Sequence, residues 1–264
     1  MGEHWSLKEA LMRVVISSGH SRFVRGAVGI LDEVNEARRV VPRVAAHLRN
    51  AGATVTEFHD DVSRTQSANL GAIVAFHNRQ TRDLDVSVHF NAFQRTESPR
   101  GTEVLHKSHA AMAARVSRAM ASAAGFINRG AKVRNDLSFL NRTARPAILL
   151  EVCFVDSGAD ARLYQRHFED ICRAIAESIL DRPVTPSPNP EPELRPTIRQ
   201  GDTGDAVREL QTLLDGLNAD GIFGPRTNEA VRLFQRESGL VEDGIVGPLT
   251  WGALLAEDSN DGTI

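Results

Sequence analysis

The pattern of apolar and polar positions divides the first 181 residues into short strand-like and longer helix-like segments. Short apolar runs, typical of strands, occupy residues 13–17, 54–58, 85–90, 103–105 and 147–152. Apolar residues recur at helical spacing in the segments between them, which are residues 32–50, 66–77, 108–124 and 160–180. This alternation predicts an α/β fold, with a mostly parallel sheet flanked by helices on both faces.

A proline-rich stretch interrupts this pattern and predicts a linker. Residues 182–196 read RPVTPSPNPEPELRP and lack periodic apolar positions, which favours an extended and semi-rigid segment. The sequence therefore predicts two domains, residues 1–181 and residues 197–264.

The second domain contains an internal repeat. The sequence DGIFGPRTNEAV begins at Asp220, and DGIVGPLTWGAL begins at Asp243. Each unit places a glycine turn and a proline ahead of a helix, and residues 205–214 form another amphipathic helix before them. We therefore expect a small all-α module of three helices. It has no His and no Cys, so catalytic chemistry is expected in the first domain.

Charge differs between the two parts, although the net charge of -3 is close to neutral. Residues 1–182 carry 25 Lys and Arg against 20 Asp and Glu, whereas residues 183–264 carry 6 against 14. The basic excess of the first part is too weak to predict nucleic-acid binding, and the acidic second part argues against it.

Cysteines and apolar runs exclude further classes of protein. With only Cys153 and Cys172, the sequence predicts two reduced core cysteines rather than a disulfide framework. The N-terminal residues MGEHWSLKEALMR do not resemble a signal peptide, and no apolar run approaches the roughly 20 residues needed to span a bilayer. We expect no membrane insertion.

Three titratable residues lie at or within predicted strands. His20 follows the first strand, His89 lies near the end of the strand DVSVHF, and Glu151 interrupts the apolar strand AILLEV. Functional groups of α/β sheets gather at the carboxyl ends of strands, and a buried carboxylate without a partner costs several kcal/mol. Imidazoles, a carboxylate and an open position are what a catalytic zinc site needs.

A third protein ligand would complete such a site, and two glutamates compete for the role. Glu33 lies 7, 8, 11 and 15 residues before apolar positions of the helix, which places it on the inward side; Glu36 is the alternative. Taken singly, His20 and His89 also fit hydrogen-bonded structural histidines, and Glu33 fits a carboxylate at a helix N-terminus. Structural or surface roles are expected for His59, His77, His106, His109 and His167.

Several motifs in the same order resemble the zinc-dependent N-acetylmuramoyl-L-alanine amidases of the LytC/AmiC type, and within them phage endolysins. They are SSGHS, GAVGILDEVNEARRVV, TQSANLGAIVAFHN, DVSVHFNAF, GTEVL, NRGAK and PAILLEVCFVD, within residues 12–180. The resemblance implies one catalytic Zn²⁺ bound by His20, Glu33 and His89, with Glu151 as the catalytic acid/base. It also implies hydrolysis of the amide bond between N-acetylmuramic acid and L-alanine.

This sequence departs from the family pattern at three positions. Ser17 and Ser21 replace a frequent Asp and a frequent Gly around His20, and Cys153 stands where Gly is common. The first departure is expected to weaken support for the metal. None of them removes a ligand or the acid/base.

Residues 197–255 resemble the peptidoglycan-binding domain 1 family through IRQGDTGDAVRELQTLL, AVRLFQ and the repeated turns. The resemblance implies peptidoglycan as the partner. A zinc peptidase cutting within the stem peptide and a catalytically silent wall-binding protein are the alternatives. We expect the protein to be a monomer that acts on the cell wall. We also expect it to be a phage or prophage lysin made in the host cytoplasm.

Overall fold

The computed structural model describes residues 11–184, 195–214, 216–240, 242–247 and 250–255. The chain forms two compact units, Met1–Ser187 and Pro188–Ile264, which are described separately below. Most of the N-terminal segment used in the signal-peptide prediction, and most of the predicted linker at 182–196, lie outside the described residues.

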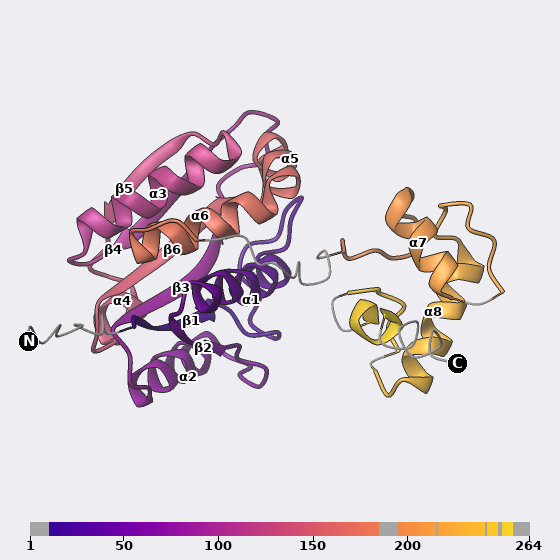
Figure 1. Ribbon diagram of the computed structural model, residues 1–264, viewed down its shortest axis with the longest axis horizontal. Coiled ribbons are helices and arrows are strands. Elements are labelled where there is room, and N and C mark those ends of the chain that lie inside the picture. The colour runs from indigo at the N-terminus through magenta and orange to yellow at the C-terminus, as the bar shows by residue number, and fades with distance from the viewer. Residues whose placement is uncertain (1–10, 185–194, 215, 241, 248–249, 256–264) are drawn as a thin grey trace, which may run out of the picture. The chain divides into compact units, whose positions relative to one another are not determined.

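A six-stranded sheet in the order β2-β1-β3-β6-β4-β5 forms the centre of the first unit (Figure 1). Four of its five pairings are parallel, and only the β4–β6 pairing is antiparallel. The mostly parallel sheet predicted from the sequence is therefore confirmed. The strands are β1 (Arg13–Ser18), β2 (Thr54–Phe58), β3 (Leu84–Asn91), β4 (Thr102–His106), β5 (Asn128–Val133) and β6 (Ala147–Phe154).

Helices cover both faces of this sheet because successive residues of a strand point to opposite sides. On one face, Leu149 of β6 packs with side chains of α2 and α4, including Ile73 and Phe139. On the other face, α1 and α3 each contact α6 and the sheet. The helices of this unit are α1 (Glu33–Asn50), α2 (Gln66–Arg79), α3 (Ala110–Ala124), α4 (Ser138–Arg142), α5 (Gly158–Arg166) and α6 (Phe168–Leu180).

The single long helix predicted over residues 160–180 is wrong, because the chain forms two helices there. His167 leaves the helical conformation, with φ -115° and ψ 22°, and separates α5 from α6. Both segments are amphipathic: α5 buries Tyr164 and α6 buries Ile171 and Ile175. The apolar periodicity therefore continues through the break, which is why the pattern alone did not reveal it.

Two short elements were not predicted. Strand β5 reads NRGAKV, pairs only with β4 at the sheet edge, and has no buried residue. An edge strand without an apolar face lacks the alternation by which strands are recognised. Helix α4 has five residues, too few to show a helical period.

The second unit is a small helical module, as predicted. It contains α7 (Asp205–Leu213), α8 (Pro225–Glu237) and a helical segment at residues 250–255. Its core gathers Leu210, Phe223, Val231 and Trp251, and the Trp251 indole N–H donates to the carbonyl of Pro196 at 3.0 Å. The module thus has a hydrophobic core of its own.

The sequence repeat of this module is also a repeat of hydrogen bonds. The side-chain amide of Gln211 donates to Asp220 and Thr227 and accepts from the backbone N–H of Gly221. Gln235 makes the same three contacts, with Asp243, Thr250 and the N–H of Gly244. Each buried glutamine therefore fastens one glycine turn to the helix that follows it.

Two further expectations concern cysteines and membranes. Cys153 and Cys172 are free and buried, which confirms the prediction of two reduced core cysteines. Burial raises the pKa of the Cys153 thiol well above its ordinary value, so this side chain is inert at neutral pH. Among the described residues, no helix is both long and apolar enough to cross a bilayer.

Candidate active site

The register of three parallel strands brings the candidate residues to one edge of the sheet. In β1 and β3, Ser17 pairs with Ser87, and His20 follows two residues after the end of β1. In β3 and β6, His89 pairs directly with Glu151. Residues paired across neighbouring strands point to the same face, so His89 and Glu151 lie side by side at the carboxyl ends of their strands.

His20, Glu33 and His89 come together as the sequence predicted. One ligand atom from each residue lies within 4.8 Å of the other two. Glu33 Oε1 lies 2.9 Å from His89 Nδ1 and 3.4 Å from His20 Nε2. Three residues distant in sequence thus converge on one point, which neither helix nor strand periodicity could show.

Glu33 is held in place by the backbone around it. It is the first residue of α1, where Asp32 caps the helix by accepting from the Asn35 N–H. Its carboxylate accepts from the N–H of Ala27 at 2.6 Å and from the N–H of Phe90 at 3.1 Å. These backbone contacts therefore orient the side chain toward the histidines.

Glu36, the alternative ligand, is engaged elsewhere. Its carboxylate accepts from the Tyr164 hydroxyl at 2.8 Å and from Arg39 at 2.6 Å. The geometry of the described residues therefore favours Glu33 over Glu36 at this cluster.

The two carboxylates of the site have opposite pKa shifts. Burial alone would raise the pKa of Glu33, but the hydrogen bonds from His20 and His89 outweigh it and hold that pKa well below its usual range. Burial raises the pKa of Glu151 well above its usual range, and the charges of Glu33 and Glu103 act in the same direction. The anion of Glu33 is thus stabilised, whereas the surroundings of Glu151 favour its protonated form.

Glu151 has an oxygen without a partner. Its Oε2 atom is buried and has no hydrogen bond within the part of the chain that the structure describes, although the strand around it is apolar. An unpaired buried carboxylate oxygen is costly, so it indicates a group kept for chemistry rather than for stability. His20 Nδ1 is likewise buried and has no hydrogen-bond partner within the described part of the chain.

Two glycines beside the cluster have a role that was not predicted from the sequence. A Cβ atom on Gly19 would lie 1.9 Å from the His89 ring, and one on Gly26 would lie 2.0 Å from Glu33 Oε2. Both positions therefore require glycine because of the space that the His89 and Glu33 side chains occupy. The only sequence signal was a glycine directly before His20 and another shortly before Glu33.

Polar side chains also anchor the loop that carries His20. Asn69 of α2 donates to the Gly19 carbonyl at 3.0 Å, and Ser21 donates to the Ser63 carbonyl at 2.7 Å. Ser21 Oγ in turn accepts from the N–H of Val24 at 2.9 Å. Ser21, which replaces a frequent glycine, therefore contributes to the fold of the loop.

A buried polar network lies beneath the site. His77 contacts Asp85 through Nδ1 at 2.8 Å and Ser17 through Nε2 at 2.9 Å, and Arg82 donates two hydrogen bonds to Asp85. The order Ser–His–Asp resembles a hydrolytic triad, but Ser17, His77 and Asp85 are fully buried. The network therefore ties β1, β3 and α2 together, which confirms the structural role expected of His77.

The cluster fits the donor set of a single zinc ion. Two imidazoles and a carboxylate are common zinc ligands, and tetrahedral coordination separates its ligand atoms by about 3.4 Å. The observed ligand atoms lie within 4.8 Å of one another, so small side-chain movements would complete the coordination. The residue that pairs with His89 across the sheet is Glu151, whose Oε2 atom is buried without a partner among the described residues.

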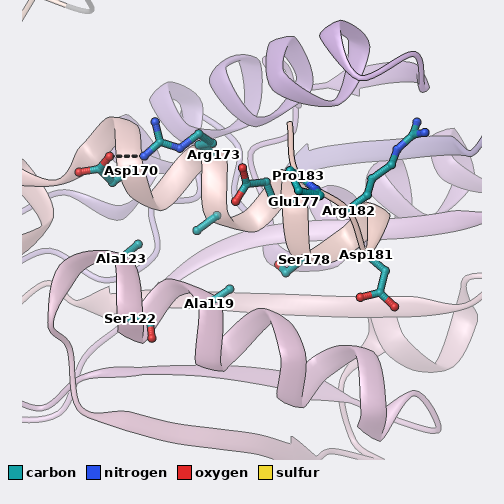
Figure 2. A pocket seen from close by; sticks show the side chains of 11 residues that line it. Ala119, Ser122, Ala123, Asp170, Arg173, Glu177, Ser178, Asp181, Arg182 and Pro183 are labelled. Atoms are coloured by element: carbon teal, nitrogen blue, oxygen red, sulfur yellow. Dashed lines mark hydrogen bonds and ion pairs between the residues drawn. The ribbon is translucent and has the colours of Figure 1, made fainter. Parts of the chain in front are cut away.

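A hollow in another part of the first unit carries no comparable chemistry. Figure 2 shows this groove of about 580 Å³ between α3 and α6, with Ala119 and Ala123 on one side. Its charged groups already have partners: Asp170 pairs with Arg173, Glu177 accepts from the Val184 N–H, and Arg182 donates to the Ala51 carbonyl. The groove contains neither the histidines nor Glu151.

Comparison with known proteins gives the same division of the chain. A family described as N-acetylmuramoyl-L-alanine amidase matches residues 14–181, and a family described as a peptidoglycan binding domain matches residues 203–254. An uncharacterized protein of Clostridium perfringens is 30% identical over 187 residues, covering 68% of this chain and 55% of the relative. The chain thus spans about half the length of this curated relative.

Two solved structures are similar to the first unit. The catalytic domain of an endolysin targeting Clostridia difficile is 26% identical with a TM-score of 0.61, covering 66% of this chain and 99% of its own. The N-acetylmuramoyl-L-alanine amidase AmiC2 of Nostoc punctiforme is 25% identical with a TM-score of 0.57, covering 64% of this chain and 96% of its own.

The close approach of Gly19 to His89 can be tested with a single methyl group. We expect Gly19→Ala to displace the His89 ring and weaken Zn²⁺ binding by at least about 10-fold, measured by titration with a competing chelator. Gly71→Ala is the matched control, because Gly71 lies in α2 and an added Cβ meets nothing within 4 Å. Unchanged Zn²⁺ affinity in Gly19→Ala would contradict this role of the glycine.

Proposed function

Since the chain belongs to the N-acetylmuramoyl-L-alanine amidase family over residues 14–181, we propose that it hydrolyses the amide bond between N-acetylmuramic acid and L-alanine in peptidoglycan. The observation that carries this proposal is the convergence of His20, Glu33 and His89 beside the unpartnered Glu151. A metal-ligand set next to a carboxyl group of raised pKa is the minimum apparatus of a metal-assisted amide hydrolase.

We further propose that His20, Glu33 and His89 hold one Zn²⁺ ion. Bound zinc supplies Lewis-acid chemistry, by polarising the scissile carbonyl and making a water molecule acidic enough to attack near neutral pH. The chain's own contribution is to fix the ligands. Glu33 is fixed by the N–H groups of Ala27 and Phe90, and the His20 loop is fixed by Asn69.

Glu151 carries the proton in this proposal. It accepts the proton of the attacking water as the water oxygen bonds to the carbonyl carbon, and it delivers that proton to the amine nitrogen as the carbon–nitrogen bond breaks. Its buried environment supports both steps, because a raised pKa lets the protonated form persist long enough to act as an acid.

The C-terminal module supports a polymeric substrate. Residues 203–254 match a peptidoglycan binding domain and have a core separate from that of the first unit. A tethered module raises the local concentration of cleavable bonds around the enzyme. We infer an endolysin-like enzyme acting on the cell wall, and a phage or prophage origin and a monomeric state remain predictions.

The mutation Glu151→Gln tests the acid/base. We expect the variant to keep its fold and bound Zn²⁺ but to lose at least about 100-fold in kcat, because an amide cannot accept or donate the proton. Glu57→Gln, in which a half-buried carboxylate of β2 paired with Arg49 is changed, is the matched control. Activity close to wild type in Glu151→Gln would exclude the assignment.

Metal removal tests the zinc site separately. We expect chelation to abolish hydrolysis and one equivalent of Zn²⁺ to restore it, with elemental analysis giving one zinc per chain. An enzyme that stays active after verified removal of metal would rule out the metal mechanism.

Mass spectrometry of digested peptidoglycan identifies the bond that is cleaved, because an amidase releases a free L-alanine N-terminus whereas a peptidase cutting within the stem peptide does not.

Deletion of residues 183–264 tests the role of the module. We expect turnover of intact sacculi to fall by about 10-fold or more, while turnover of small muropeptides is retained, because only the polymer offers repeated binding sites. Dye release from labelled sacculi and chromatography of muropeptides measure the two rates. Equal loss on both substrates would mean that the module is part of the catalytic fold.

A further inference from the structure

A second hollow lies at the same sheet edge as the proposed acid/base. It has a volume of about 300 Å³ and is lined by Asn91, Ala92, Phe93, Arg100, Arg129 and Phe154. No role in the reaction described above involves these residues.

A shift in strand register places this hollow on the face of the sheet that carries Glu151. From His89 to Asn91, β3 advances two residues, whereas β6 advances three, from Glu151 to Phe154. An extra residue in one strand turns the following side chain to the opposite face. Phe154 therefore shares a face with Glu151 instead of alternating away from it.

Glu103 connects the hollow to the acid/base. It pairs with Glu151 across β4 and β6, and its charge contributes to the raised pKa of Glu151. One oxygen of Glu103 accepts from Asn91 at 3.0 Å, and the other accepts from Arg129 at 2.7 Å. Glu103 thus contacts two residues that line the hollow and pairs across the sheet with the proposed acid/base.

The hollow keeps an excess of positive charge. The negative charge of Glu103 offsets the positive charge of Arg129. The Arg100 side chain instead donates a hydrogen bond to a neutral group, the Gln94 carbonyl, at 3.0 Å. Arg100 Nε is buried without a partner within the described part of the chain. A guanidinium has five N–H donors, so Arg100 retains donors for a ligand.

Aromatic rings hold these guanidinium groups in position. Arg100 lies 4.9 Å from the ring centroid of Phe93 and 5.7 Å from that of Phe154, and Arg129 lies 5.0 Å from Phe154. Hydrogen bonds also hold the loop between β3 and β4, which carries Phe93 and Arg100. Asp160 accepts from the N–H groups of Arg100 and Gly101, and Asp156 accepts from the N–H of Phe93 at 2.7 Å. Contacts within the protein therefore hold both the guanidinium groups and the backbone around the hollow.

We propose that this hollow binds a carboxylate on the peptide part of the substrate, with Arg100 as the principal contact. Arginine forms planar, bidentate hydrogen bonds with carboxylates, and the Phe154 ring offers an apolar floor for the adjoining carbon atoms. The inference rests on the proposed function, because it assumes that the amide cleaved beside Glu151 joins a sugar acid to a peptide.

The test uses two soluble N-acetylmuramoyl tripeptides that differ only at the second peptide residue, which carries either a free carboxylate or a carboxamide. We expect the wild-type enzyme to cleave the carboxylate substrate with a kcat/KM about 10- to 100-fold higher, mainly through KM, since a charge-assisted hydrogen bond is gained. In Arg100→Met this ratio should fall toward 1.

Two further variants separate recognition from folding. Arg95→Met removes the same charge from an exposed position of the same loop and should keep the wild-type ratio. Arg100→Lys keeps the charge but loses the planar fork, so its ratio should be intermediate, which a variant that fails to fold would not give. Circular dichroism and zinc content verify that each variant is folded.

Two results would overturn the inference while leaving the proposed function intact. They are equal kcat/KM values of the wild-type enzyme on the two substrates, and an unchanged ratio in folded Arg100→Met. Cleavage of neither substrate at the sugar–peptide amide by the wild-type enzyme would instead overturn the proposed function, and the inference with it.

Discussion

The hydrogen-bonded register of β1, β3 and β6 is the constraint on which the site depends. His89 and Glu151 face each other only because the two parallel strands pair at these positions. A slip of one residue would turn either side chain to the opposite face of the sheet. The buried contacts of His77 with Ser17 and Asp85 lie two or more residues before the cluster and help to hold this register. Buried residues outside the cluster thus help to determine which groups meet at the strand ends.

Burial raises the pKa of both glutamates of the site, but the groups around them give the two carboxyls opposite net shifts. Glu33 meets two imidazoles and two backbone N–H groups, so its anion is stabilised. Glu151 meets an apolar strand and other carboxylates, so its neutral form is favoured. In the proposed mechanism, environment rather than residue type therefore divides the work between a metal ligand and an acid/base.

Much of this arrangement could be predicted from the sequence. The apolar runs gave β1, β2, β3 and β6 within two residues, and the inward face of α1 pointed to Glu33. The features that could not be predicted depend on the space between side chains distant in sequence and on strand pairing. The clash that a side chain at Gly19 would make involves a residue 70 positions away, and the break at His167 interrupts no apolar periodicity. Strand β5 draws its stability from pairing with β4 rather than from an apolar face of its own.

The placement of Trp251 in the core of the helical module gives the protein a built-in optical reporter. The chain has two tryptophans, Trp5 and Trp251, and a single tyrosine, Tyr164, which is buried in α5 of the first unit. Replacing Trp5 by phenylalanine would leave indole emission to the module alone. The unfolding of the module could then be followed by itself in one intact chain.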